Sequence, residues 1–178
     1  MDDDGAAEEA KLRAAANLDI SERVSHKLWK ARKAAYEFVL LQLSSTDGAS
    51  QHKQYARFTP AMISDSNPGA QDVACDAILK LLQVCESSVV TDVAGPLAKS
   101  TVSKGAFKGR PGIVKKSTDI LLLLVEHECA EDVMRHVAGA YKDKVAKVLH
   151  LPSIFHTYRT CDSDLSTSLT ICGVDRRE

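Results

Sequence analysis

Apolar residues recur along this chain with the period of an amphipathic helix. In the clearest segment, six of them follow the i, i+3, i+4, i+7, i+8, i+11 spacing that gathers side chains on one helical face: Ala74, Ala77, Ile78, Leu81, Leu82 and Cys85. A second predicted core-facing helix carries Ala31, Ala35, Phe38, Val39 and Gln42 at this spacing. A third carries Ile113, Ile120, Leu121, Leu124 and Val125. We therefore expect three inner helices that face a common core.

A weaker helical segment and a polar turn precede each inner helix. The weaker segments are residues 20–27, with Ser21 as N-cap, then 51–64 and 88–105. In the second turn, Asn67 suits a turn and Pro68 suits a first helical position. The third turn, residues 107–112, is too rich in Gly and Pro to be helical. A further helix over residues 131–141 leads to residues 142–144, where a fourth hairpin could open.

The turns lie at Trp29, Asn67, Arg110 and Asp143, which are separated by 38, 43 and 33 residues. Helix pairs of HEAT and armadillo repeats recur every 40 to 47 residues or so. The spacing thus predicts an all-α fold, an irregular α-solenoid of about three HEAT-like hairpins with a partial fourth and an irregular C-terminal tail. Stacking would align the intra-repeat turns along one border, so that Trp29, Asn67 and Arg110 form a continuous ridge.

Composition narrows the function. The chain has 178 residues and a formal net charge of −1, which argues against general affinity for nucleic acid. The charge is uneven, since residues 1–10 hold five carboxylates and no cation, whereas residues 104–116 hold five cations and no acid. No apolar run reaches the roughly 18 residues of a membrane span, and the acidic N-terminus is unlike a secretory signal.

The five cysteines, Cys75, Cys85, Cys129, Cys161 and Cys172, lack C-x-x-C spacing and are typical of small buried side chains in a reducing compartment. His127, Cys129 and His136 match no zinc-ligand pattern, so we expect no metal and no cofactor. Phosphate-binding loops, zinc-protease and serine-hydrolase motifs are also missing. We therefore expect a protein that is not an enzyme.

The lone tryptophan lies in the string Ser25-His26-Lys27-Leu28-Trp29-Lys30-Ala31-Arg32. This string, together with Ser64-Asp65-Ser66-Asn67 and with Gly109-Arg110 followed by Lys115-Lys116 and a Leu-rich helix, resembles the first half of a TOG (tumour-overexpressed-gene) domain of the microtubule polymerases. The resemblance covers about residues 20–148.

The resemblance implies a HEAT-type paddle whose turn edge grips the curved, unpolymerised αβ-tubulin dimer. By this likeness, the first turn would offer Trp29 and Lys30 to β-tubulin. The second would offer Ser66, Asn67 and Pro68, the third Lys108 and Arg110, and the fourth the neighbourhood of Lys142 and Lys144. Cations on a common ridge would orient encounter with acidic tubulin, and a desolvated Trp would supply much of the affinity.

Structural roles compete with binding roles at several of these positions. Trp29 could instead fill a gap between packed helices. Asn67 could be only a turn former, and Arg32 could pair inside its own hairpin with an acid such as Glu37. Lys115 and Lys116 could belong to a solvated face with secondary contacts.

By this interpretation, residues 1–19 are an acidic segment compatible with a helix, residues 20–148 a partial TOG domain, and residues 149–178 a tail without helical period. A complete TOG domain has about six helix pairs, so we expect weaker tubulin binding than a full domain gives and no polymerase activity. Four apolar residues of the tail could cover the last open repeat: Leu149, Leu151, Ile154 and Phe155.

The sequence therefore predicts a tubulin-binding module that contributes to microtubule growth, plus-end or spindle organisation. Its partner would be the αβ-tubulin dimer, with other microtubule-associated proteins as further candidates, and it would act as a monomer, without nucleic acid or membrane. Its place would be the cytoplasm and cytoskeleton: microtubules, spindle and microtubule-organising centre. The alternative is a generic HEAT-repeat scaffold that binds a partner other than tubulin.

Overall fold

A computed structural model describes residues 3–45, 52–106 and 110–142, and these ranges contain helices and no strand. In chain order the helices are α1 (Asp3–Ala16), α2 (Ile20–Val24), α3 (Trp29–Ser44), α4 (His52–Ala56), α5 (Thr59–Ile63), α6 (Pro68–Val84), α7 (Ser87–Ser100), the π-helix η2 (Thr101–Ala106), α8 (Pro111–Glu126) and α9 (Ala130–Lys142). The expected all-α class is confirmed.

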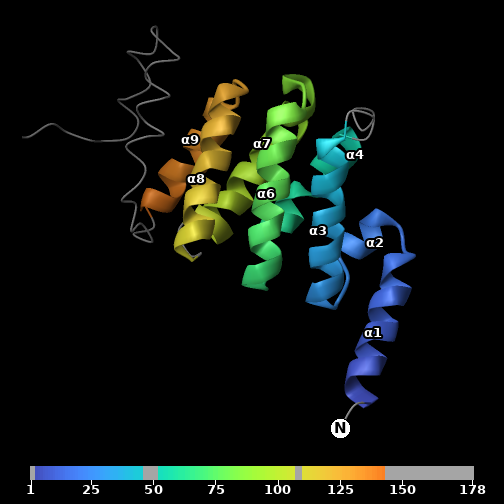
Figure 1. Ribbon diagram of the computed structural model, residues 1–178. Helices are drawn as coiled ribbons and strands as arrows, with labels where there is room; N and C mark the ends of the chain where they lie inside the picture. The colour runs from blue at the N-terminus through green and yellow to red at the C-terminus, as the bar shows by residue number, and fades with distance from the viewer. Residues whose placement is uncertain (1–2, 46–51, 107–109, 143–178) are drawn as a thin grey trace, which may run out of the picture.

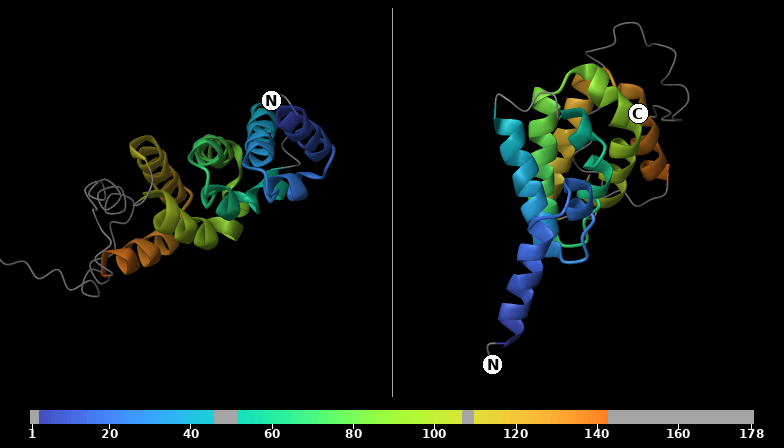
Figure 2. Two further views of the ribbon diagram at one scale, coloured as in Figure 1. Left: turned by 90° about the horizontal axis from the view of Figure 1, so that it is seen from below. Right: turned by 90° about the vertical axis from the view of Figure 1, so that its right-hand side faces the viewer.

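The helices form two layers (Figures 1 and 2). Helices α3, α6 and α8 stand side by side and run in the same direction, with α3 packed on α6 and α6 on α8. The second layer consists of α2, α5, α7 and α9, and α7 packs on both α5 and α9. Each inner helix thus follows, along the chain, a partner helix in the second layer, which confirms the solenoid of HEAT-like hairpins.

The core lies between the layers and is lined by the predicted apolar faces. Every residue of the Ala74–Cys85 pattern is buried, and so is every residue of the Ile113–Val125 pattern. In α3 the residues Ala31, Ala35 and Val39 are buried, but Phe38 is 37% exposed and Gln42 is half-buried. The prediction for Phe38 was wrong because α3 is the first inner helix, which packs against another inner helix on one side only. The guanidinium of Arg23 covers the Phe38 ring at 5.1 Å instead.

The helix starts agree only in part with the sequence prediction. Asn67 caps α6 and Pro68 is its first residue, as predicted. Ser21 is not an N-cap, because α2 already begins at Ile20, after Asp19, and that start has no side-chain cap hydrogen bond. The third turn was predicted to extend through Gly112, but α8 begins at Pro111, since proline fits a first helical position where no N–H bond is lost.

Close backbone packing fixes the segment that leads into the third turn. Gly105 of η2 lies against α8, where a Cβ atom would collide with the Oγ of Ser117. At the opposite border, His127 Nε2 lies 2.6 Å from the carbonyl oxygen of Leu82, and its Nδ1 lies 3.0 Å from Ser87 Oγ. The third hairpin is therefore packed closely within itself at Gly105, and the contact between His127 and Leu82 joins the end of α8 to the end of α6.

The described cysteines, Cys75, Cys85 and Cys129, are buried and unpaired as expected. None of the described helices has both the length and the hydropathy that a bilayer span requires. The predicted fourth turn, the proposed cover over the last repeat, and Cys161 and Cys172 lie outside the described residues.

Candidate binding edge

The first residues of the three inner helices lie along one border of the solenoid, the lower one in Figure 1. Trp29 is the first residue of α3, and Asn67 and Arg110 are the N-cap residues of α6 and α8. We call residues 26–30, 64–69 and 110–112 the turn edge. Because packed helices lie 8–10 Å apart, its first and third turns are about 20 Å from each other.

The first turn presents Trp29 to solvent. The residue is 40% exposed, so the indole does not fill a core gap, and the interior alternative for this side chain was wrong. Lys30 Nζ lies 6.0 Å from the centre of the Trp29 ring system, at the outer limit of a cation–π contact. The turn itself is held by a hydrogen bond from Leu28 N–H to His26 Nδ1 at 3.1 Å. A flat apolar ring and a cation therefore share one rigid support.

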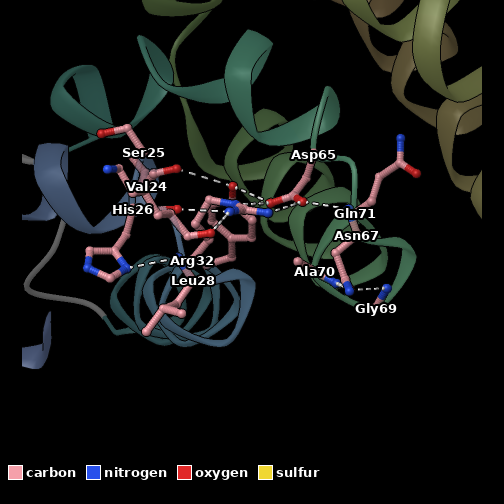
Figure 3. Close-up of polar contacts among 12 residues, drawn as sticks. Val24, Ser25, His26, Leu28, Arg32, Asp65, Asn67, Gly69, Ala70 and Gln71 are labelled. Atoms are coloured by element: carbon pink, nitrogen blue, oxygen red, sulfur yellow. Dashed lines mark hydrogen bonds and ion pairs between the residues drawn. The ribbon is translucent and has the colours of Figure 1, made fainter. Parts of the chain in front are cut away.

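An ion pair joins the first turn to the second (Figure 3). Arg32 donates from Nε to Asp65 Oδ2 and from Nη2 to Asp65 Oδ1, both at 2.7 Å. Its Nη1 also donates to the carbonyl oxygens of His26 and Lys27, at 2.8 and 3.1 Å. Tyr36 Oη donates to Asp65 Oδ2 at 3.0 Å. Arg32 thus pairs internally, which was one of the two alternatives, but with Asp65 of the next repeat, whereas Glu37 pairs with Lys33.

This network shifts the ionisation of its members. Burial by itself raises the pKa of Asp65, but hydrogen bonds from Arg32, from the Asn67 N–H and from Tyr36 outweigh it, so the pKa is lowered. The pKa of Arg32 is raised, chiefly by its hydrogen bond to Asp65. Burial, and then the charge of Asp65, raise the pKa of Tyr36. The pair is therefore ionised throughout the neutral range.

The second turn continues from the same carboxylate. Asp65 Oδ1 accepts from Asn67 N–H at 2.8 Å, and Asn67 Oδ1 accepts from the N–H groups of Gly69 and Ala70 at 2.9 and 3.1 Å. The turn-forming role of Asn67 is therefore real, and its Nδ2 amide is the group that it could offer to a partner. Ser66 is exposed and Pro68 is half-buried beside it.

The third turn carries exposed positive charge. Arg110 is exposed and makes no side-chain cap bond, and Lys115 is exposed one turn further into α8. Lys116 is engaged internally, because its Nζ lies 2.9 Å from Asp72 Oδ1 and 2.7 Å from Asp76 Oδ1 of α6. Of the two adjacent lysines, Lys116 therefore joins repeats, and Lys115 faces solvent.

Some of the predicted contact residues cannot be placed and one has an unexpected partner. Lys108 and Lys144 lie outside the described residues. Lys30 forms an ion pair with Glu8 of α1 at 3.0 Å, which the sequence did not predict because the residues are 22 positions apart.

Among the described residues, no cluster of His, Cys, Asp or Glu could hold a metal ion.

Most of the chain matches a known protein family. Residues 15–158 match the family described as XMAP215/Dis1/CLASP, TOG domain. The chain belongs to this family. The match extends over the described hairpins from the end of α1 to α9, so the turn edge is the turn edge of a TOG solenoid.

Similar TOG proteins are much longer than this chain. It is 32% identical over 149 residues to Protein MOR1 of Oryza sativa subsp. japonica, which covers 83% of this chain and 7% of that protein. It is 25% identical over 137 residues to the spindle pole body component alp14 of Schizosaccharomyces pombe, covering 74% of this chain and 17% of alp14. The chain thus spans only a small part of the relatives that it matches.

A solved structure has the same fold. It comes from work on tubulin recruitment and assembly by microtubule polymerases with TOG domain arrays, and it aligns with a TM-score of 0.57 at 24% identity. The alignment covers 79% of this chain and 29% of that one. At this identity the likeness supports the helical solenoid alone.

Proposed function

We propose that this chain is a tubulin-binding module that docks the αβ-tubulin dimer on its turn edge and contributes to microtubule growth and spindle organisation. The observation that carries the proposal is the alignment of Trp29, Asn67 and Arg110 at the starts of three parallel helices in a TOG-family chain. Membership of the family and the resemblance of the turns to those of microtubule polymerases support tubulin as the client.

The chemistry of the turn edge suits an acidic protein surface. Trp29 offers an exposed aromatic plate on a support held by several hydrogen bonds, so little order has to be created on binding. Lys27, Lys30 and Arg110 add exposed positive charge within the turn edge, and Lys115 is a further exposed cation in the following turn of α8. Such a distribution raises the rate of encounter with a negatively charged partner and fixes its orientation.

We infer the same contact set as the resemblance implies: Trp29, Lys30, Ser66, Asn67, Pro68 and Arg110, with Lys108 and Lys144 as further members. The role is one of binding rather than catalysis. Association with spindle poles and microtubules would follow from the client, in keeping with the relative that is a spindle pole body component.

The experiment compares binding of soluble αβ-tubulin by the whole chain and by the double variant Trp29→Ala, Arg110→Ala. Truncation of a desolvated aromatic anchor costs about 2–4 kcal/mol, so we expect Kd to rise by well over tenfold. The matched control is Leu41→Ala, Lys53→Ala, which removes an exposed apolar group and an exposed cation near the opposite border. We expect this control to bind as the unchanged chain does.

Undiminished binding by the double variant would reject the turn edge as the site. A folded chain that does not bind tubulin in any form would instead favour the other candidate, a HEAT-repeat scaffold for a different partner. Circular dichroism of each variant checks that the helices are retained.

A further inference from the structure

Helix α1 lies outside the two layers of the solenoid. It stands beside α3 at the end of the row of inner helices, and its first turns project past the start of α3 (Figure 2). The five residues that precede Glu8 in α1 span about 7 Å along the helix axis. This overhang points to the side where a partner on the turn edge would lie.

Helix α1 packs on the rest of the protein through few side chains. From Gly5 to Ala16, all side chains are exposed except Glu8, Leu12 and Ala15, which recur at helical spacing on one face. Only Ala15 is fully buried. A helix that buries so little apolar surface opens at low free-energy cost, because local stability follows the contacts that an element makes.

Among the described residues, the ion pair that joins α1 to α3 involves a residue of the proposed binding site. Glu8 Oε2 lies 3.0 Å from Lys30 Nζ, and both side chains are less than half exposed. Lys30 follows Trp29 directly, and its ammonium also approaches the Trp29 ring. While α1 is docked, the positive charge of Lys30 is neutralised by Glu8 of the same chain.

The net charge of residues 1–19 also opposes the binding of an acidic partner. Residues 1–19 hold six carboxylates and two cations, a net charge of −4. An acidic partner that approaches the first turn therefore meets a segment of its own sign, which opposes association.

We propose that α1 is an autoinhibitory arm, which holds Lys30 through Glu8 and places an acidic overhang beside Trp29, so that tight docking of an acidic partner requires α1 to move away. This inference rests on the proposed function, since the partner is αβ-tubulin. It adds a regulated state of the edge, in which any change that releases α1 raises affinity.

The test measures Kd of the whole chain for soluble αβ-tubulin with the variants Glu8→Gln and Glu9→Gln. Glu9 is the matched control, because it lies in the same helix and carries the same charge, but it pairs with Arg13 rather than with α3. Removing an exposed ion pair changes an equilibrium by at most about fivefold. We expect Glu8→Gln to tighten Kd about two- to fivefold and Glu9→Gln to change it by much less.

A second variant tests the helical structure of α1 without changing its charge. Ala10→Pro keeps every charge but breaks α1 in its middle, where proline is strongly disfavoured. We expect it to tighten Kd at least as much as Glu8→Gln, together with faster amide exchange in residues 3–16. Weaker binding by Ala10→Pro would overturn the proposal, because α1 would then belong to the docking surface.

Equal effects of Glu8→Gln and Glu9→Gln on a chain that binds tubulin would overturn the autoinhibitory arm and leave the proposed function standing. Absence of tubulin binding by the unchanged chain and by all three variants would overturn the proposed function, and the arm with it.

Discussion

Of the polar contacts of the turn edge, the ion pair between Arg32 and Asp65 should be the one whose loss lowers the free energy of unfolding most. The Asp65 side chain has no exposed surface, and that of Arg32 has 16%. In Arg32→Ala, the Asp65 carboxylate would lose two bonds of 2.7 Å and keep those from Tyr36 Oη and Asn67 N–H. A buried charge that loses its partner costs about 3–5 kcal/mol, so we expect a loss of that size in the free energy of unfolding.

The assay is urea unfolding followed by circular dichroism, with the free energy obtained by linear extrapolation. Arg32→Lys should lie between the unchanged chain and Arg32→Ala, because an ammonium cannot bind both carboxylate oxygens in a fork and also reach two carbonyl groups. The double variant Arg32→Ala, Asp65→Asn should recover part of the loss, since no uncompensated charge is left. The control is Arg13→Ala, whose exposed pair with Glu9 should be worth less than about 1 kcal/mol.

At low pH, the ion pair between Arg32 and Asp65 should lose its contribution to the free energy of unfolding. The pKa of Asp65 is lowered from its ordinary value of 3.8, so its stabilisation is fully present above that value and is lost as pH falls through the lower pKa of the folded state. We therefore expect the difference between the unchanged chain and Asp65→Asn to shrink only below about pH 4. An Arg32→Ala variant within about 0.5 kcal/mol of the unchanged chain at pH 7, or additive losses in the double variant, would refute this reasoning.

Two further predictions concern the core. Gly105→Ala should lower the free energy of unfolding by about 1–3 kcal/mol in the same urea assay, because its Cβ would collide with Ser117 Oγ. Gly139→Ala, which has open space around the new methyl group, should be neutral or stabilising. Equal effects of the two substitutions would contradict this account. Burial raises the pKa of Cys75 to about 12, so a thiol-alkylating reagent at pH 8 should modify it only in urea, as peptide mass mapping would show; rapid modification of the folded chain would contradict its burial.

The sequence by itself determined the class of fold and the positions of the first three turns. Periodic apolar faces within one helix are a local property, so the burial of Ile78 or Leu121 followed from spacing alone. Asn67-Pro68 is likewise a local helix-start signal, and the observed start of α6 confirms it. The family resemblance is carried by short strings such as the one around Trp29, which depend on residue order and not on packing.

The tertiary structure decided which polar groups are exposed and which are engaged in contacts between repeats. Asp65 lies 33 residues beyond Arg32, and Asp72 lies 44 residues before Lys116, and no local period links such positions. The exposure of Phe38 depends on α3 having an inner-helix neighbour on one side only, and the Glu8–Lys30 pair depends on where α1 turns back. Helix period fixes the face on which a side chain lies, but only the packing of repeats fixes what that face meets.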